Sequence, residues 1–173
     1  NVNANFTGSN IDNAVGSLNI DSISFRRDGT GFYMDKLLIE ASGNSEDRKL
    51  KISSDIVNGE VIGEFSFATI ANSVKRTFHP YLPSLISIDN INTNNIKDNN
   101  FSLNFTIGNT ETVSRIFSLP FTILSEAKII GQYNNSFEKF KLEVYYPSGR
   151  IGNTLLQSGQ LFVENKDGAI TST

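Results

Sequence analysis

The stretch SSDIVNGEVIGEFSFATIANSVKRTFHPYLPSL, residues 53–85, contains the signals on which the fold prediction depends. It holds Asn58-Gly59, the dipeptide most typical of a two-residue type I′ hairpin turn, in which both central residues need positive φ. From Val61 to Phe67 every second residue is apolar or glycine, which is the period of a strand with one buried face. The stretch therefore predicts a hairpin of two antiparallel strands.

After residue 67 the apolar period changes from two to four. Ile70, Val74 and Phe78 then fall on one side of a helix of about three turns. His79-Pro80 ends this pattern, because the residue before proline disfavours the helical region. We predict a helical insertion over residues 68–79, with His79 in a capping or packing role.

The rest of the chain reads mainly as short alternating strands. The clearest examples are residues 101–107 and 140–146, where apolar and polar side chains alternate. In residues 31–42, Tyr33 shares its parity with Leu37. A second short helix, TETVSRIF, is expected after Thr110, whose side chain could cap it.

One strand carries an irregularity that its pattern reveals. Leu18 and Ile20 share one parity, whereas Ile23 and Phe25 fall on the other. Because side chains alternate strictly along a strand, an extra residue near position 21 or 22 is needed, as in a β-bulge.

These patterns define the fold class. We predict an all-β chain of roughly ten short strands with one or two short helices, forming one β-rich unit over residues 1–173. The sheet is expected to be antiparallel and either curled and partly open or closed as a β-sandwich. The polar end, residues 165–173, is expected to be a frayed tail.

Composition excludes several classes of protein. The 173 residues include 0 Cys, which excludes disulfides and zinc–thiolate sites. The net charge of -3 is spread along the chain with both signs mixed, so no basic surface for nucleic acid is expected. No apolar run is long enough for a membrane-spanning helix.

No catalytic or metal-binding motif is present. The single His has no nucleophile motif to join, and the carboxylates are scattered over different strands. The Asn-rich segment 89–100 offers oxygen atoms, but it lacks the glycine and ligand spacing of a calcium loop. We therefore predict a non-enzymatic protein without metal or cofactor, in which residues 89–100 form a polar loop.

The aromatic composition favours rings that are buried in a core or in contact with lipid. The chain has 13 Phe and 5 Tyr but 0 Trp, and phenylalanine rings favour buried sites or contact with acyl chains. The pattern favours a closed core over the lining of an apolar groove and leaves both readings open. The candidate residues are Val61, Phe65, Phe67, Ile70, Val74, Phe78, Phe101, Leu103, Phe105, Ile107, Ile129, Phe140, Leu142 and Val144. The alternative function is a cell-surface β-sandwich that binds glycan through exposed Tyr133, Tyr145 and Tyr146.

Several short motifs resemble the C-terminal region of TamB-like translocation and assembly module proteins, in the Bacteroidetes branch of the AsmA/TamB superfamily. The resemblance spans nearly the whole chain, although each motif is short and mostly structural. The similar motifs are residues 10–18 (NIDNAVGSL), 50–55 (LKISSD), 63–65 (GEF), 81–84 (YLPS), 100–103 (NFSL) and 130–134 (IGQYN).

The resemblance implies a segment of a larger periplasmic protein that is anchored in the inner membrane. It further implies a β-taco fold, a long curled sheet with an apolar concave face. Such proteins are thought to conduct phospholipids between the inner and outer membranes, and to support outer-membrane protein assembly with a TamA-type barrel partner. The expected partners are therefore phospholipid acyl chains and such a barrel, with no catalytic residue carried over.

Overall fold

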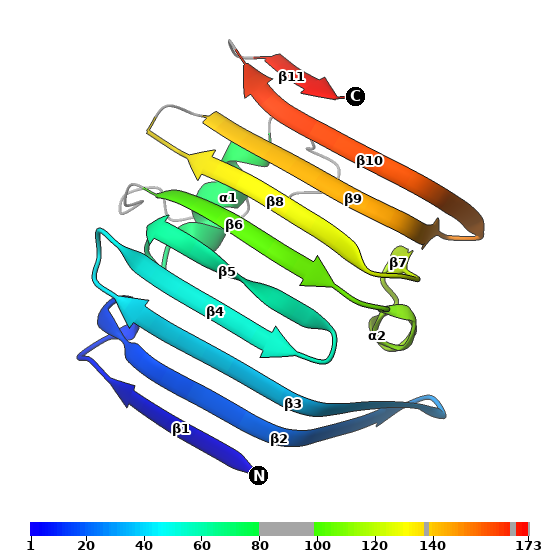
Figure 1. Cartoon of the computed structure of the whole chain (residues 1–173), viewed down its shortest axis with the longest axis horizontal. Coiled ribbons are helices and arrows are strands. Elements are labelled where there is room, and N and C mark those ends of the chain that lie inside the picture. Colours follow the sequence, from blue (N-terminus) through cyan, green and yellow to red (C-terminus); the bar gives the residue numbers. More distant parts are fainter. Residues whose placement is uncertain (80–98, 137–138, 167–168, 173) are drawn as a thin grey trace.

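The computed structural model describes residues 1–79, 99–136, 139–166 and 169–172, which form one open antiparallel sheet with two short α-helices (Figure 1). The strand order is β1-β2-β3-β4-β5-β6-β8-β9-β10-β11, with β7 paired to β9. The elements are β1 (Val2–Thr7), η1 (Ile11–Asn13), β2 (Val15–Arg27), β3 (Thr30–Gly43), β4 (Arg48–Ser54), β5 (Val57–Glu64), α1 (Ile70–Phe78), β6 (Asn100–Ile107), α2 (Glu111–Phe117), β7 (Phe121–Ile123), β8 (Ala127–Asn134), β9 (Lys139–Ile151), β10 (Thr154–Lys166) and β11 (Ala169–Ser172).

The sheet is a meander with two free edges, β1 and β11. Every strand pair in the described part of the chain is antiparallel, and the two edge strands do not pair with each other. The prediction of an open antiparallel all-β fold with two short helices is confirmed, and the closed sandwich is not formed. The expected fraying of residues 165–173 is wrong for Ala169–Ser172, which pair with β10.

The hairpin between β4 and β5 turns at Asp55-Ile56, so the prediction of a turn at Asn58-Gly59 is wrong. The Oγ of Ser54 accepts hydrogen bonds from the backbone N–H groups of Ile56 (3.3 Å) and Val57 (2.9 Å). The side-chain amide of Asn58 donates to the carbonyl of Ser54 at 2.8 Å. Because these side chains bind the turn backbone, the turn needs no glycine with positive φ.

The backbone is irregular at Ser22, where an irregularity was predicted, but the predicted bulge is wrong because neither strand gains a residue over the other. Ser22 has a left-handed φ of 64°. The register is the same on both sides of it, with Asp21 opposite Lys36 and Ile23 opposite Met34. Asp35 therefore stands opposite Ser22, one residue against one, and the side-chain alternation shifts in both strands at this point.

This paired kink changes which side chains face inward. Beyond it, Met34 is buried and the ring of Phe25 stacks on Phe117 of α2. Tyr33 is 61% exposed, so the expectation that it shares a face with Leu37 is wrong.

The β9–β10 hairpin has a kink of the same kind. Ser158 has a φ of 51° and stands opposite Pro147, again without a change of register. Both kinked hairpins extend toward the right end of Figure 1, and α2 lies between them. Arg27 Nη1 donates to the carbonyl of Ile116 at 3.1 Å, and Arg150 pairs with Glu111 at 3.2 Å.

The two helices match their sequence predictions closely. Helix α1 lies within the predicted range 68–79, and His79 occupies its C-cap position, with its backbone N–H bonded to the carbonyl of Lys75 at 2.9 Å. Helix α2 begins as expected after Thr110. However, the Thr110 side chain does not cap it and instead accepts from the N–H of Ile123 at 2.9 Å. The Oδ1 of Asn109 accepts from the N–H of Glu111 at 2.8 Å in its place.

Candidate functional site: an apolar sheet face

One face of the sheet is apolar along rows that cross six strands. Residues directly opposite each other in neighbouring strands share a face, so the register defines the rows. The first row runs Leu50, Val61, Leu103, Gly131, Leu142 and Val163. The second row runs Ile52, Gly59, Phe105, Ile129, Val144 and Leu161. We call the surface that these two rows form the apolar face.

Glycine occurs in each row where a large neighbour needs space. A Cβ on Gly131 would lie 3.0 Å from Cγ of Leu103, and a Cβ on Gly59 would overlap the ring of Phe105. These two large side chains therefore lie over the glycines of the adjacent strands, which keeps the apolar face close-packed.

At one end, helix α1 covers this face and forms a core with it. Buried Val61, Phe65, Phe101, Tyr133 and Phe140 make up the cluster, each at most 9% exposed. The partly buried residues packed against it are Leu50, Phe67, Ile70, Val74, Leu103, Phe105 and Val163. Nine of the candidate groove or core residues thus belong to this cluster, and at this end of the sheet they are core.

Aromatic contacts hold the segment before α1 against the sheet, and the hydroxyl of Thr77 hydrogen-bonds α1 itself to β8. The ring of Phe65 meets Phe67 at 5.3 Å and Phe101 at 6.0 Å, both edge-to-face. Tyr133 shares a 2.7 Å hydrogen bond with the hydroxyl of Thr77. Burial raises the pKa of Tyr133 above its ordinary value, against the smaller lowering effect of the Thr77 bond.

Four further candidates lie beyond this cluster: Ile107, Ile129, Leu142 and Val144. All four are half-buried. The register places Ile129, Leu142 and Val144 on the apolar face, and Ile107 pairs with Val57 and Ala127 in the adjacent row. Leu161, at the end of the second row, is 42% exposed. The side chain of Phe78 and all of residues 80–98, including most of the Asn-rich segment, lie outside the described residues.

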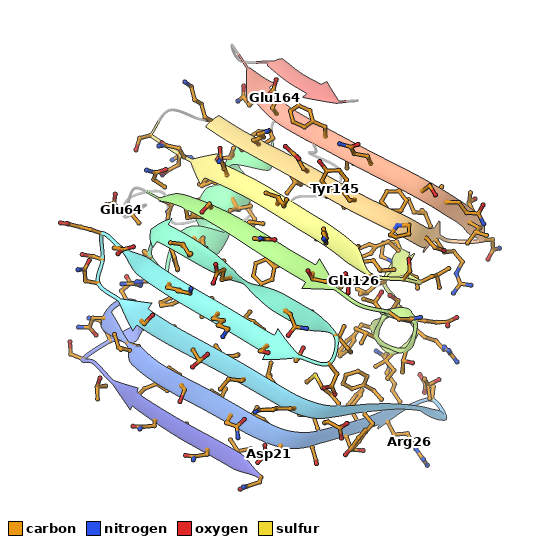
Figure 2. All side chains as sticks on the ribbon, in the orientation of Figure 1. Asp21, Arg26, Glu64, Glu126, Tyr145 and Glu164 are labelled. Carbon is orange, nitrogen blue, oxygen red and sulfur yellow. The ribbon has the colours of Figure 1, made fainter. Side chains whose placement is uncertain are left out.

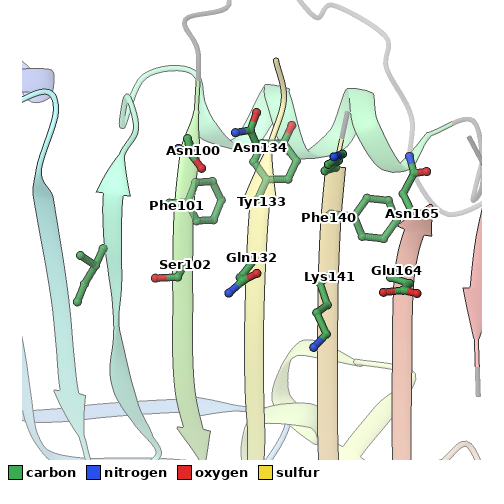
Figure 3. Close-up of a pocket in the computed structure, with 12 residues that line it drawn as sticks. Asn100, Phe101, Ser102, Gln132, Tyr133, Asn134, Phe140, Lys141, Glu164 and Asn165 are labelled. Atoms are coloured by element: carbon green, nitrogen blue, oxygen red, sulfur yellow. The ribbon is translucent and has the colours of Figure 1, made fainter. Parts of the chain in front are cut away.

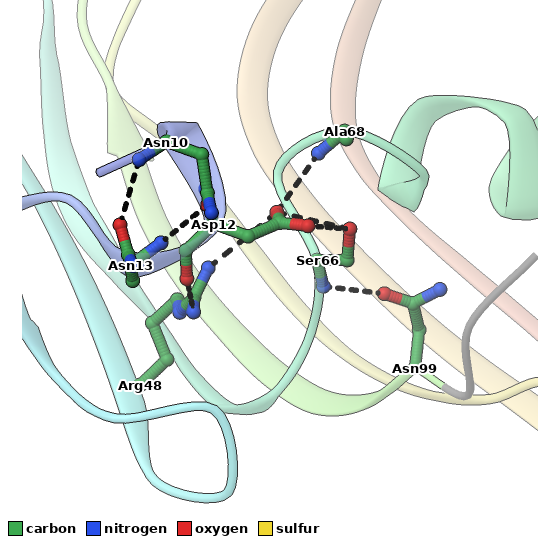
Figure 4. A network of polar contacts seen from close by, with 7 residues as sticks. All are labelled: Asn10, Asp12, Asn13, Arg48, Ser66, Ala68 and Asn99. Carbon is green, nitrogen blue, oxygen red and sulfur yellow. Dashed lines mark hydrogen bonds and ion pairs between the residues drawn. The ribbon is translucent and has the colours of Figure 1, made fainter. Parts of the chain in front are cut away.

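A buried polar network fixes the start of α1, and sequence reasoning missed it (Figure 4). Asp12 of η1 accepts hydrogen bonds from the hydroxyl of Ser66 (2.9 and 3.0 Å) and from the N–H of Ala68 (3.2 Å). It also forms an ion pair with Arg48 at 3.8 Å. Asn99, fully buried, accepts from the N–H of Ser66 and donates to Ser73 of α1. These residues are far apart in the sequence, so no local pattern could reveal the network.

The opposite face of the sheet is mainly polar and charged, and Ile62, Ile130 and Phe162 also lie on it. Lys49 pairs with Glu60 at 2.7 Å, and Lys141 pairs with Glu143 at 2.7 Å. The hydrogen bonds that Lys141 and Tyr145 donate hold the pKa of Glu143 below its ordinary value. This pattern matches the alternation predicted from sequence, with one wet and one apolar face.

A shallow depression of about 540 Å³ lies on the polar face. Figure 3 shows Ser102, Gln132, Lys141 and Glu164 side by side across β6, β8, β9 and β10. The depression offers hydrogen-bonding and charged groups. Residues 1–79, 99–136, 139–166 and 169–172 contain no group of three potential ligands that could hold a metal ion.

The three tyrosines expected to form an exposed cluster do not meet on one face. Tyr133 is buried under α1 at 5% exposure. Tyr145, labelled in Figure 2, stands opposite Lys128 and belongs to the polar face at 37% exposure. Tyr146 is half-buried and has the opposite parity to Tyr145. The expectation of a tyrosine platform is wrong because these residues alternate across the sheet.

Comparisons of the chain with protein-family models, with curated proteins and with solved structures find no match. Among the described residues, no helix is both long and apolar enough to cross a membrane.

Proposed function

We propose that this chain is a non-enzymatic module of a TamB-like periplasmic protein and that its apolar face receives phospholipid acyl chains. The observation that carries the proposal is the pair of uninterrupted apolar rows across six strands, with the polar side chains on the other face. In this proposal the parent protein is anchored in the inner membrane and works with a TamA-type outer-membrane barrel.

The dimensions of the face fit a lipid chain. Six strands at about 4.8 Å spacing give a row about 24 Å long. An acyl chain reaches about 15 Å, half the hydrocarbon thickness of a bilayer. Moving such a chain from water onto this face is favourable by about 0.8 kcal/mol for each buried CH₂ group.

In this proposal helix α1 separates the apolar face into a part that is buried core and a part that binds lipid. The row through Val61 and Leu103 is filled by the α1 core, whereas the second row, in which only Phe105 packs against that core, is the proposed acyl path. The path would run across the strands and pass the end of the α1 core.

Binding of a fluorescent phospholipid to the purified chain tests the proposal. Ile129 and Ile130 are a matched pair, because they are neighbours in β8 that point to opposite faces. We expect Ile129→Ser to weaken lipid binding about tenfold, since it removes apolar contact area from the path. Ile130→Ser should bind as the unchanged chain does. Equal effects of the two substitutions, at equal melting temperatures, would contradict the proposal.

A second candidate function is glycan binding on the polar face. The depression lined by Asn100, Ser102, Gln132 and Asn134 favours it, because amides and hydroxyls hydrogen-bond to sugar hydroxyls. The absence of a shared tyrosine platform weighs against it. Calorimetry with envelope polysaccharides tests this candidate, and no heat of binding would remove it.

A further inference from the structure

The four middle strands of the sheet, β4, β5, β6 and β8, all stop at one row of residues. The residues at which they stop are Ser54, Val57, Ile107 and Ala127. The β2–β3 and β9–β10 hairpins continue beyond this row, and each has its kink just past it, at Ser22 and Ser158. Beyond the row none of the four middle strands separates the two hairpins, and α2 and β7 occupy that space (Figure 1).

Helix α2 and β7 join strands that are not neighbours in the sheet. Helix α2 contacts β3, and β7 pairs with β9. In the strand order, β4, β5, β6 and β8 all stand between β3 and β9. We call residues 110–123, which include α2 and β7, the strap. Because this one short segment touches both hairpins, it fixes how far apart they stand at this end of the open sheet.

The strap is firmly attached on the β9 side. Its β7 part forms a ladder with β9, and α2 folds back on β7 through two buried hydroxyls. Thr110 donates its N–H to the carbonyl of Ile123 at 2.8 Å, and its hydroxyl accepts from the N–H of Ile123 at 2.9 Å. The hydroxyl of Ser114 donates to the carbonyl of Phe121 at 2.8 Å. Separating α2 from β7 would leave these buried polar groups without partners, which is costly.

The attachment on the β2–β3 side is lighter and reached by water. The rings of Phe25 and Phe117 stack at 6.2 Å, although they are 46% and 58% exposed. The guanidinium of Arg27, whose side chain is 55% exposed, donates to the carbonyl of Ile116 at 3.1 Å. Ile116 itself is buried. The two sides of the strap therefore differ: a backbone ladder with buried hydrogen bonds holds one, and a few side-chain contacts hold the other.

We propose that the strap is a releasable closure of the open sheet, anchored on β9 and opening on the β2–β3 side. Segments held by few buried contacts are the ones that open first in a folded protein. Release separates the two hairpins and widens this end of the sheet, while α2 stays with β7 and β9. The balance between the closed and released states is set by the contacts that only the closed state makes. Those contacts are the ring stack, the Arg27 bond and the burial of Ile116.

This inference goes beyond the proposed function, because it concerns the shape of the sheet and holds whether or not the apolar face binds lipid. Its experiments are carried out without lipid and leave Ile129 and its row unchanged. Failure of the strap proposal and failure of the lipid proposal are therefore distinguishable.

The distance between the two hairpins tests the closure. The chain has 0 Cys, so Ser24→Cys and Gln157→Cys place a single pair of spin labels on exposed positions beyond the two kinks. Double electron–electron resonance then measures the distance between the labels. The strap variant Arg27→Gln, Phe117→Ala removes the hydrogen bond and the ring stack on the β2–β3 side. We expect its population of longer distances to rise about tenfold, from the loss of one charge-assisted hydrogen bond and one aromatic pair.

A matched control changes the same residue types without touching the strap. Arg26 neighbours Arg27 in β2 and therefore points to the opposite face, and Phe6 is a 45% exposed ring on β1. Arg26→Gln, Phe6→Ala should keep the distance distribution of the unchanged chain. Circular dichroism and melting temperature check that every labelled chain is folded. If the double strap variant does not fold, Arg27→Gln and Phe117→Ala are measured singly, and each should shift the distribution part of the way.

A third label tests which side of the strap opens. Arg115, exposed in the last turn of α2, is replaced by cysteine and paired in turn with Ser24→Cys and with Gln157→Cys. In the strap variant we expect the distance from α2 to the β2–β3 label to lengthen. The distance from α2 to the β9–β10 label should stay as it is in the unchanged chain.

Three results would overturn the proposal. The strap variants could keep the distance distribution of the unchanged chain, which would mean that these contacts do not hold the hairpins together. The control could shift the distribution as much as the strap variant does. The distance from α2 to the β9–β10 label could lengthen instead of the other, which would place the anchor on the wrong side.

Discussion

The guanidinium of Arg48 lies between the carboxylate of Asp12 and the rings of Phe65 and Phe67. Its distance to the Phe67 ring centre is 4.8 Å, its distance to Asp12 Oδ1 is 3.8 Å, and the residue is 4% exposed. A buried cation in this position is stabilised by the carboxylate and by the ring faces together. The relationship joins η1, β4 and the segment before α1 at the point where the helix meets the sheet.

Removing Asp12 alone should destabilise the chain strongly. Asp12→Ala leaves the guanidinium of Arg48 buried without its carboxylate, and we expect a loss of about 3 kcal/mol in the free energy of unfolding. Urea unfolding measures it. The double variant Asp12→Ala, Arg48→Met should recover part of the loss, because methionine keeps the packing without the charge. A double variant that is as unstable as the single one would contradict this account.

The effect of a substitution at the β2 kink on stability should depend on how well the new residue adopts the left-handed backbone of Ser22. Ser22→Val places a β-branched side chain at a φ of 64°, and we expect it to cost about 1–2 kcal/mol. Ser22→Gly, the control, should be neutral or slightly stabilising because glycine adopts this φ freely. Thermal unfolding compares the two. Equal melting temperatures for the valine and glycine variants would show that the kink is not held in this conformation.

The same comparison applies at Ser158 in the β9–β10 hairpin, which has a φ of 51°. Ser158→Val should lower the melting temperature relative to Ser158→Gly. If only one of the two kinked hairpins responds to valine, the structural equivalence of the kinks is wrong.

Tyr133 should make stability fall at high pH. Its pKa is raised in the folded state by burial, so its contribution is fully present below the unfolded pKa of about 10. That contribution is lost as pH rises through the folded pKa, because the unfolded chain releases this proton first.

Tyr133→Phe isolates this effect from the other titrating groups. At pH 8 we expect it to cost about 1 kcal/mol through the lost hydrogen bond to Thr77. Between pH 9 and 11, a range of about one pH unit on each side of the ordinary tyrosine pKa, the variant should lose less stability than the unchanged chain. If the unfolding free energies of Tyr133→Phe and of the unchanged chain changed with pH in the same way, that result would contradict the burial of Tyr133.

Sequence patterns predicted those parts of the fold that depend on local periodicity. The alternation in residues 101–107 gave a correct strand, and the fourfold spacing of Ile70 and Val74 gave α1. The parity change near Ser22 correctly located a kink. These signals are local, because the repeat of a helix or a strand fixes the direction of each side chain relative to its neighbours in the chain.

The wrong predictions concern features that depend on particular contacts, which the apolar–polar period of the sequence does not show. Asn58-Gly59 resembled a turn, but the side chains of Ser54 and Asn58 stabilise a turn at Asp55-Ile56. That Asp35 stands opposite Ser22 without a change of register is visible only when β2 and β3 are paired. The candidate face was predicted residue by residue, whereas its division into an α1 core and an open row required the tertiary contacts.

Photo-crosslinking in cells tests the central claim most directly. A crosslinking residue at Val144, in the second row of the apolar face, is compared with one at Glu143, its neighbour on the polar face. We expect phospholipid adducts at Val144 and few or none at Glu143. Adducts to protein alone at Val144, or equal lipid capture at both positions, would contradict the proposal.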